Sequence, residues 1–488
     1  MKVIVKRSKR SQARLALAIG AVILLAALIS AVSVSPARGG AVTRPVPLLR
    51  IAARGTTLSF PPDTDWCVEQ LGIRCYQPAQ LQKAYDLAPL FAGGVTGKGE
   101  TIVIVDSFGS PTIKSDLATF DQTFGLPDPP SLRVYQPAGA VPAFDPTNDD
   151  MVGWAEETTL DVEWSHVMAP GANIVLLETP VSETEGVQGF PEIVKAENWA
   201  LNHNIGDVIS MSFGATEQTF PSKASILGLR SAFINAHARH VAVVSSSGDA
   251  GSTDYELNLN DLYPYQVTSW PTSDPLVTSI GGTQLTLDEN GNRLQPDVVW
   301  NDGYGAGGGG LSTVFRRPAF QAGLGAVVDH RRGVPDISMS AAVDGGVVVY
   351  YTFANAGYHI FGGTSESAPE FAGIVALADQ YGGRRINDLN AKLYELDYRH
   401  GLVDVTVGDN YIGPFTNSDG VTYDVPGFSA GPGYDLASGL GTIDGALFVP
   451  ALAGRPKAPR MPVLLPYSGR AQRHVMRQIG LLHAPPRR

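Results

Sequence analysis

The hydrophobic pattern of the chain becomes regular near residue 78, where short apolar runs rich in β-branched residues begin to alternate with segments of helical periodicity. The predicted strands cover residues 101–106, 173–177, 207–212 and 241–246. The predicted helices cover residues 78–90, 115–124, 154–168, 191–202, 223–238 and 385–396. Continuous apolar strands that alternate with helices predict an α/β fold, with a parallel sheet covered by helices on both faces.

The most informative apolar run extends from Ala368 to Tyr381 and is hydrophobic on nearly every side, which predicts a buried helix. Either Thr364 or Ser365 can cap this helix, and Pro369 suits its first turn, where no intrahelical N–H bond is lost. Glycines before Ser365 allow a close backbone approach, and a helix N-terminus favours developing negative charge. Ser365 is therefore a candidate nucleophile, and the alternative is an ordinary capped core helix.

The start of the chain has the organisation of an export signal. A basic stretch precedes the uncharged apolar residues 15–34, and small residues follow near position 37. The apolar run is also long enough to span a bilayer, so a cleaved signal and a retained membrane anchor both remain open. We expect residues 1–37 to form this segment and the protein to be secreted, or anchored outside the cytoplasmic membrane.

Composition and charge narrow the range of functions. The 488 residues are 44% hydrophobic and 17% charged, which is globular, and the net charge of −11 argues against a nucleic-acid partner. The predicted organisation is a short linker or pro-region at 38–76, a main domain at 77–452 and a basic, disordered tail at 453–488. Cys67 and Cys75 are expected to form a disulfide if the chain is exported, and two free thiols are the alternative.

Two groups of acids could do chemistry with Ser365. Glu157 and Asp161 lie one turn apart on the predicted helix 154–168, where like charges cost about 0.2–0.5 kcal/mol unless they share a proton. Such a pair can act as a base in acid, although acidic pairs are also common on exposed helices. Asp249 follows a predicted buried strand and, as a neutral acid, could donate to an oxyanion; the alternative is a turn aspartate.

Together these segments resemble the sedolisins, or serine-carboxyl peptidases. The motifs that carry the resemblance are Gly363-Thr364-Ser365 with Pro369, Glu157-x-x-x-Asp161, and the segments 169–172, 210–217, 247–251, 299–301, 309–312 and 335–338. They stand in the order of the family and cover roughly residues 77–450. The resemblance implies a subtilisin-like, doubly wound and mainly parallel sheet with helices on both faces.

The resemblance also implies roles for individual residues. Ser365 would attack the peptide carbonyl, Glu157 would act as the base, Asp161 would orient Glu157, and Asp249 would stabilise the oxyanion as a neutral acid. The substrate-lining segment would include Ser210, Ser212 and Gly214. The expected protein is a monomeric peptidase that is most active in acid on protein or peptide substrates, acting as an endopeptidase or a tripeptidyl-peptidase.

The family resemblance further implies one bound calcium ion. The matching positions are the carboxylates of Asp404 and Asp435 and the carbonyls of Val405, Gly431 and Gly433. Hard oxygen ligands on glycine-rich loops suit calcium, and turns with incidental aspartates are the alternative.

Two other functions remain open. One is a conventional subtilisin-like protease that uses His166 and Asp106; without a suitable histidine motif, Asp106 is more simply a turn residue, and it is left out of the expected site. The other is a secreted binding protein that keeps the fold without catalysis. Sedolisins usually have a large folded prosegment, whereas only residues 38–77 separate the expected signal from the first regular helix, so the sequence predicts no activation mechanism.

Overall fold

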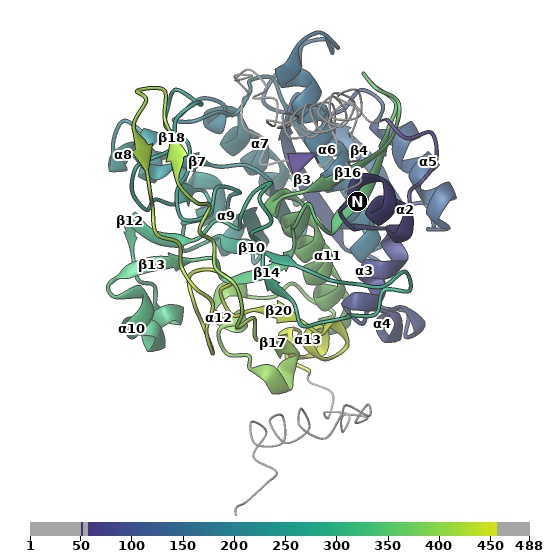
Figure 1. Cartoon of the computed structure of the whole chain (residues 1–488). Coiled ribbons are helices and arrows are strands. Elements are labelled where there is room, and N and C mark those ends of the chain that lie inside the picture. The colour runs from purple at the N-terminus through teal and green to yellow at the C-terminus, as the bar shows by residue number, and fades with distance from the viewer. Residues whose placement is uncertain (1–49, 52–56, 456–488) are drawn as a thin grey trace, which may run out of the picture. The chain divides into compact units, whose positions relative to one another are not determined.

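The structure is a computed structural model of the chain that describes residues 50–51 and 57–455 (Figure 1). The predicted signal or anchor, with its apolar run at 15–34, and the basic tail beyond residue 455 lie outside the described residues. In the described part of the chain, no helix combines the length and the apolar character needed to cross a membrane.

The main sheet has eight strands and is parallel except at one edge. The order across it is β11 (Val298–Val299), β10 (Thr278–Gln284), β8 (Ala242–Ser246), β6 (Val208–Met211), β3 (Thr101–Ser107), β5 (Asn173–Thr179) and β4 (Leu132–Tyr135), and β14 (Ile337–Ser340) also pairs with β10. Only β11 runs antiparallel to its neighbour. The α/β fold with a mainly parallel sheet, predicted from the alternation of strands and helices, is confirmed.

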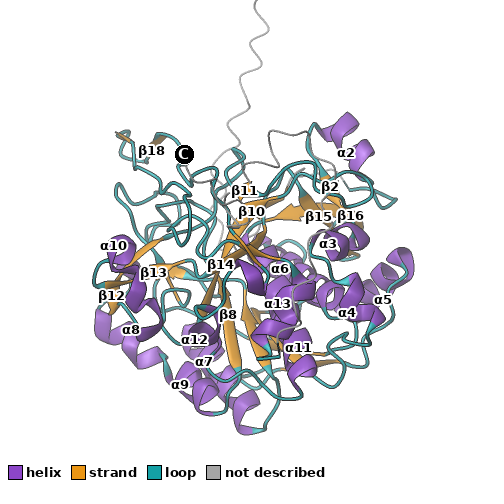
Figure 2. Cartoon of the chain, turned by 90° about the horizontal axis from the view of Figure 1, so that it is seen from below, coloured by secondary structure: helices purple, strands orange, loops and turns teal. Residues whose placement is uncertain are grey.

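Alternate residues of each central strand are buried on opposite faces of the sheet. On β3, Ile102 and Ile104 join the hydrophobic cluster that contains residues of α6 (Asp149–Met168) and α11 (Thr364–Gly382). Val103 and Val105 join the cluster that contains residues of α7 (Phe190–Asn202) and α9 (Ser231–Ala238). Figure 2 shows helices on both sides of the strands, which explains why the strands read as unbroken apolar runs.

The helix that begins with Thr364 runs through the core beside α6 (Figure 1). Gly373 permits this close approach, because a Cβ at this position would lie 2.6 Å from the Cβ of Met168. The remaining helices of the domain are α5 (Ile113–Phe124), α8 (Lys223–Leu229), α10 (Gly325–Val328), α12 (Leu389–Leu393) and α13 (Gly445–Leu452), with short 3₁₀ turns at Glu217–Thr219, Ala319–Leu324 and Tyr398–His400.

Three predicted helices differ in the structure. The helix predicted at 78–90 is divided into α3 (Pro78–Ala84) and α4 (Ala88–Ala92) by Asp86, whose φ is 50°. The helix predicted at 223–238 is divided at Arg230, which ends α8 and precedes α9. The helix predicted at 385–396 shortens to α12, because Asp388 (φ 53°) caps a new start.

A second, smaller sheet joins two short strands of the segment before residue 77 to two strands of the main domain. Its order is β1 (Arg50–Ile51), β16 (Gly357–Gly362), β15 (Gly346–Tyr351) and β2 (Cys75–Tyr76). Asp63 caps α2 (Thr64–Leu71), and Cys67 and Cys75 form the expected disulfide. Residues 57–76, which the sequence pattern assigned to a linker or pro-region, therefore form regular structure held by a cap, a disulfide and strand pairing.

The loops of the domain carry further short strand pairs. These are β7 (Ala215–Thr216) with β9 (Ser269–Trp270), β12 (Gly310–Arg316) with β13 (Arg331–Val334), β17 (Leu402–Val403) with β20 (Thr442–Ile443), and β18 (Phe415–Thr416) with β19 (Thr422–Tyr423).

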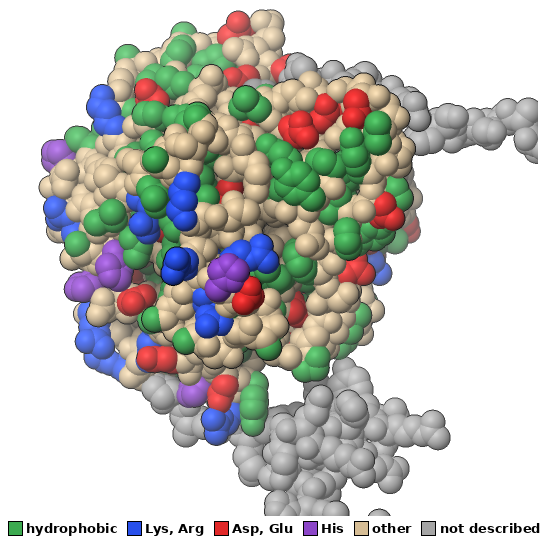
Figure 3. Space-filling model, turned by 90° about the vertical axis from the view of Figure 1, so that its left-hand side faces the viewer, with side chains coloured by type: hydrophobic (Ala, Val, Ile, Leu, Met, Phe, Trp, Pro, Cys, Tyr) green, Lys and Arg blue, Asp and Glu red, His purple; other side chains and the backbone are tan. Residues whose placement is uncertain are grey.

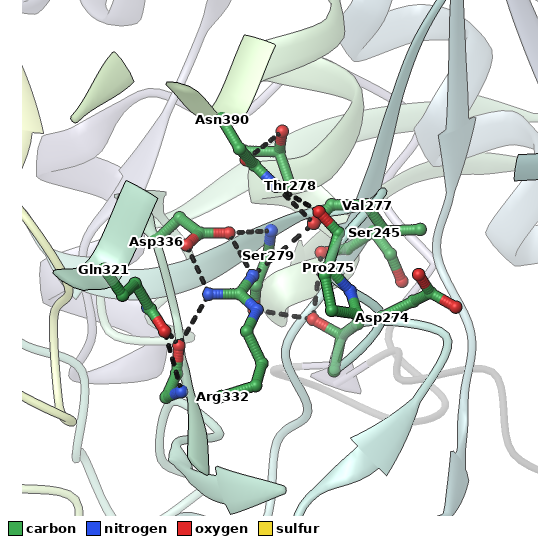
Figure 4. A network of polar contacts seen from close by, with 12 residues as sticks. Ser245, Asp274, Pro275, Val277, Thr278, Ser279, Gln321, Arg332, Asp336 and Asn390 are labelled. Atoms are coloured by element: carbon green, nitrogen blue, oxygen red, sulfur yellow. Dashed lines mark hydrogen bonds and ion pairs between the residues drawn. The ribbon is translucent and has the colours of Figure 1, made fainter. Parts of the chain in front are cut away.

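A buried ion pair links β13 to the residue that precedes β14 of the main sheet (Figure 4). The guanidinium of Arg332 lies 2.5 Å from the carboxylate of Asp336, and both side chains are completely buried. The same carboxylate accepts hydrogen bonds from the backbone N–H of Ser279 at 2.8 Å and from the hydroxyl of Tyr394 at 2.6 Å. With every acceptor site engaged, removal of either partner would leave an uncompensated buried charge.

The negative charge of the chain is partly hidden in its interior. Lys, Arg and His side chains gather on the face shown in Figure 3, although the net charge is −11. Several acids, by contrast, are completely buried. They include Asp106, Glu157, Asp161, Glu163, Glu183, Glu197, Glu366 and Glu370.

Candidate active site

Ser365 lies in the first turn of α11, beneath the carboxyl ends of the central strands. The helix is capped by Gly363, and not by Thr364 or Ser365 as predicted; its φ of 135° is a conformation that suits only glycine. Because the helix begins at Thr364, Pro369 lies in its second turn and not in its first.

The position of Pro369 leaves the backbone carbonyl of Ser365 without its helical donor, since proline has no N–H. The hydroxyl of Ser212 lies 3.3 Å from this carbonyl oxygen and replaces the missing donor only in part, because its single proton is shared with the carboxyl of Asp161. The Ser365 hydroxyl lies 3.5 Å from the carbonyl oxygen of Ser212 in turn. These contacts hold the start of α11 against the end of β6.

Glu157 is completely buried on α6 and lies beside Ser365. Burial raises the pKa of Glu157 well above its usual value, and the charges of Asp106, Asp249 and Glu156 raise it further. The Ser365 hydroxyl opposes this rise in the pKa. Among the described residues, neither carboxyl oxygen has a hydrogen-bond partner of ordinary geometry, so the carboxyl is held next to the hydroxyl without a competing donor.

Asp161 lies one turn further along α6 and is also completely buried. Its Oδ1 accepts a hydrogen bond of 2.8 Å from the hydroxyl of Ser212. Burial raises the pKa of Asp161 well above its usual value, and the charges of Asp106 and Glu157 add to this effect. The acid pair predicted from the four-residue spacing therefore shares one buried environment.

Asp249 lies in the loop after β8, and its carboxyl contacts the first residue of α11. Its Oδ1 accepts hydrogen bonds of 2.9 Å from both the backbone N–H and the hydroxyl of Thr364. Gly248 (φ 113°) allows the tight turn, and its N–H donates to the Thr364 hydroxyl at 3.1 Å. The structure thus brings Asp249, Glu157 and Asp161 around Ser365.

Asp106 was left out of the expected site, but it lies among the same carboxyls. It is the next-to-last residue of β3, is completely buried, and raises the pKa of both Glu157 and Asp161. Burial raises its own pKa to about 7, against the effect of the Thr158 hydroxyl. An acid at the carboxyl end of a buried parallel strand is the sequence signal that could have identified it.

His166 is directed away from Ser365. Its Nε2 lies 3.3 Å from Asp121 and 2.8 Å from the carbonyl oxygen of Pro127, in a completely buried position. It follows Glu157 by nine residues, about 13 Å along the helix axis. In residues 57–455, no histidine makes a hydrogen bond or an ion pair with Ser365, and the structure does not assemble the alternative arrangement of His166 with Asp106.

The predicted substrate-lining residues occupy the end of β6 and the segment after it. Ser210, Ser212 and Gly214 are all buried. Ser212 is engaged with Asp161, whereas the hydroxyl of Ser210 has no partner among the described residues. A Cβ on Gly214 would lie 3.3 Å from the carbonyl oxygen of Trp270, so glycine keeps this segment close to β9.

The predicted calcium residues come from two loops that meet. The Asp404 carboxylate accepts from the N–H of Gly433 at 2.9 Å, and the Asp435 carboxylate accepts from the N–H of Gly431 at 2.8 Å. Burial raises the pKa of both carboxyls, against the effect of the backbone N–H groups that they accept from. Within the described chain, no group of three or more His, Cys, Asp or Glu side chains forms a metal site, so backbone carbonyls would have to complete this one.

Comparison with known proteins places the chain in a family. The pattern of the subtilase family matches residues 147–391. The chain is 32% identical to kumamolisin of Bacillus sp. (strain MN-32) over 392 residues, which are 77% of this chain and 63% of the relative. It is 27% identical to sedolisin of Pseudomonas sp. (strain 101) over 416 residues, which are 83% of this chain and 64% of the relative. The matched segments therefore span less than two thirds of these relatives.

Among solved structures, Pseudomonas sedolisin, a serine-carboxyl proteinase complexed with two molecules of pseudo-iodotyrostatin, superimposes with a TM-score of 0.64 and 25% identity. The match covers 78% of this chain and 99% of that chain. The resemblance inferred from the motifs and the fold inferred from the hydrophobic pattern are both confirmed. This chain belongs to the subtilase family, in its sedolisin group.

Proposed function

We propose that the protein is a serine-carboxyl peptidase that hydrolyses peptide bonds of protein or peptide substrates in acid, outside the cytoplasm. The observation that carries the proposal is the position of the Glu157 carboxyl beside the Ser365 hydroxyl, in a buried site where a base is required. The names of the relatives, which include kumamolisin, sedolisin and a tripeptidyl-peptidase of Aspergillus fumigatus, support it.

In the proposed reaction, the Ser365 oxygen attacks the carbonyl carbon of the scissile bond while its proton passes to Glu157. The carbonyl oxygen becomes an oxyanion at the N-terminus of α11, where Asp249 and the helix dipole stabilise it. The tetrahedral intermediate then breaks its C–N bond, and Glu157 returns the proton to the leaving amine. Water then attacks the acyl-serine while Glu157 takes its proton. The proton passes to the Ser365 oxygen as the ester bond breaks, which releases the carboxylic acid of the cleaved peptide and restores the Ser365 hydroxyl.

The acid preference follows from the number of carboxyls around Glu157. Asp161 and Asp106 lie within its electrostatic reach, and burial raises the pKa of all three groups. Because coupled carboxyls lose their protons in steps, there is a pH range in which the group holds one shared negative charge, and this leaves Glu157 able to accept a proton. As the pH rises through about 7, Asp106 loses its proton as well, and the accumulated charge opposes the working state.

The test is hydrolysis of a denatured protein from strong acid to mild alkali, beside the Ser365→Ala variant. Cleavage confined to acid and absent from the variant is the expected result. Cleavage that peaks near neutrality would point to a histidine base instead. Absence of cleavage at every pH by folded protein with an intact Ser365 would contradict the peptidase proposal and favour a binding protein.

We further propose one calcium ion at Asp404 and Asp435, completed by carbonyls of Val405, Gly431 and Gly433. When bound, the ion would neutralise the two carboxylates and connect the loops that carry them. Chelation with excess EGTA is then expected to lower the melting temperature, and Asp404→Asn to weaken this response. A melting temperature that EGTA leaves unchanged would contradict the calcium site, and added magnesium serves as the control for ionic strength.

A further inference from the structure

Three arginines that take no part in the proposed reaction meet on one strand pair. They are Arg316, the last residue of β12, Arg317, which follows it, and Arg331, the first residue of β13; we call them the arginine cluster. Arg316 and Arg331 are register partners across the antiparallel pair, so their side chains project from the same face of it. The backbone N–H of Arg317 donates to the carbonyl oxygen of His330 at 2.8 Å. The three positive side chains are therefore attached at neighbouring positions of the backbone.

The positive charge of the arginine cluster is only partly balanced by acids. Six other arginines of the described chain each pair with an aspartate, whereas none of these three guanidinium groups forms an ion pair or a hydrogen bond with another described residue. Asp329 offsets one charge, since its contact with His330 and the charge of Arg331 lower its pKa. Like charges at register partners destabilise a strand pair, so an anion bound here would stabilise it.

Exposed aliphatic side chains lie on the helices next to this strand pair. Leu227 of α8, Ile234 of α9 and Val327 of α10 are 43%, 54% and 40% exposed. These helices lie with β12 and β13 on the left-hand side of Figure 1. Figure 3 shows this side of the molecule, with hydrophobic side chains between the Lys, Arg and His side chains. We call the arginine cluster together with these three aliphatic residues the basic face.

Contacts between the elements hold the two kinds of side chain on one surface. The guanidinium of Arg317 lies against Gly325, the first residue of α10, because a Cβ added there would clash with it. Arg230, which ends α8 and precedes α9, lies 5.1 Å from the centre of the Phe315 ring on β12. The basic face therefore presents cationic and aliphatic groups in a fixed arrangement.

This combination of side chains indicates the kind of partner. Guanidinium groups pair with phosphate through two parallel hydrogen bonds, and aliphatic side chains enter the boundary between lipid headgroups and acyl chains. A nucleic acid offers the same phosphates, but its exposed bases stack on aromatic side chains. In the described chain, the large exposed hydrophobic residues of α8, α9 and α10 are all aliphatic. A lipid surface therefore complements the basic face better than a nucleic acid does.

We propose that the basic face binds the surface of a membrane that contains anionic lipids. Each arginine near such a surface strengthens binding about fivefold, and salt weakens this attraction. The inference is independent of the proposed function, because a peptidase and a non-catalytic protein with this surface would bind in the same way.

The experiment has to report the basic face and not the attachment of the whole protein, because the full chain also carries the apolar run at 15–34. A Val327→Cys variant of the full chain is labelled with the fluorophore NBD; the two cysteines of the sequence form a disulfide, so only the introduced thiol reacts. With vesicles of phosphatidylcholine and about one third phosphatidylglycerol, we expect the emission to move to shorter wavelengths and to increase severalfold, as the label leaves water. Vesicles of phosphatidylcholine alone should have no effect.

The matched control for the label is Leu294→Cys. Leu294 is 61% exposed, and the neighbouring Arg293 donates to the carbonyl oxygen of Ala84 on α3, on the right-hand side of Figure 1. Its emission should stay unchanged with both kinds of vesicle.

A second pair of variants tests the charges, with the label kept at position 327. Arg316→Gln with Arg317→Gln is expected to raise the concentration of anionic lipid needed for half of the fluorescence change about 25-fold. Lys114→Gln with Arg133→Gln removes the same charge from exposed positions of α5 and β4 and should change this concentration less than about twofold.

The outcomes separate the basic face from other modes of attachment. Unchanged emission at position 327 from protein that sediments with anionic vesicles would overturn the inference, because another part of the chain would then hold the membrane. An equal response at position 294, or equal effects of the two double variants, would also overturn it. A label at 327 that responds to a DNA duplex and not to vesicles would assign the basic face to a nucleic acid and overturn the lipid partner.

Discussion

Glu157→Gln is expected to lower kcat/KM for peptide hydrolysis by about 100- to 10,000-fold, the range over which general-base catalysis contributes. Glutamine has the shape of glutamate, so the packing of α6 against α11 should survive. It cannot take the proton of Ser365 or return it to the leaving amine. The measurement is kcat/KM at the pH of highest activity, with far-ultraviolet circular dichroism as the check on folding.

Two variants on the same helix serve as controls. Glu163 is also completely buried on α6, and it accepts from the N–H of Tyr350 at 3.1 Å, so Glu163→Gln tests the loss of a buried carboxyl outside the site. His166→Gln tests the histidine alternative. Nearly full activity of both variants beside an inactive Glu157→Gln would support the glutamate base. Nearly full activity of Glu157→Gln, or its loss only in His166→Gln, would contradict the proposed mechanism.

Much of the fold could be predicted from the sequence because its strands are buried on both faces. Ile102, Val103, Ile104 and Val105 read as one apolar run, since alternate residues enter two different cores. The same periodicity could not locate breaks made by single residues. Asp86 and Asp388 adopt positive φ values inside segments of helical pattern, and nothing in that pattern marks a backbone in this conformation.

The site was predictable where one element fixes the spacing. Glu157 and Asp161 must share a face because one helix carries both. The contacts between distant segments were not predictable in this way. The hydroxyl of Ser212 reaches both the Asp161 carboxyl and the carbonyl that Pro369 leaves without a donor, and these three residues lie far apart along the chain. Asp106 was set aside for the same reason, since its neighbours become visible only once β3 lies beside α6.

The stability of the protein is expected to fall steeply as the pH rises from about 4 to about 8. Burial raises the pKa of Asp106 to about 7 and that of Glu197 to about 8, and it raises the pKa of Glu366 and Glu370 well above the usual value. An acid whose pKa is higher in the folded state binds its proton more tightly there. Its stabilising effect is complete below the unfolded pKa and is lost as the pH passes through the folded pKa.

The size of this effect follows from proton linkage. Between its unfolded and folded pKa values, each such acid lowers the free energy of unfolding by about 1.4 kcal/mol for every pH unit. For Glu197, this window extends from about 4.5 to about 8. The melting temperature, followed by circular dichroism at fixed ionic strength, is therefore expected to be highest in acid and to fall continuously toward neutrality.

The pair Glu366 and Glu370 gives the sharpest form of this prediction, because both lie in the first two turns of α11 and all four of their carboxyl oxygens lack partners among the described residues. Only the Ser340 hydroxyl opposes the rise in the pKa of Glu366, and the charge of Glu366 raises the pKa of Glu370.

The double variant Glu366→Gln with Glu370→Gln keeps the shapes of both side chains but removes both titrations, so its melting temperature should fall less between acid and neutral pH. Glu289→Gln, at an exposed position, should follow the unaltered protein. A double variant with an unchanged dependence on pH would show that these two carboxyls stay protonated throughout or are reached by water, and the loss of stability would then have to come from Asp106, Glu197 and the acids around Ser365.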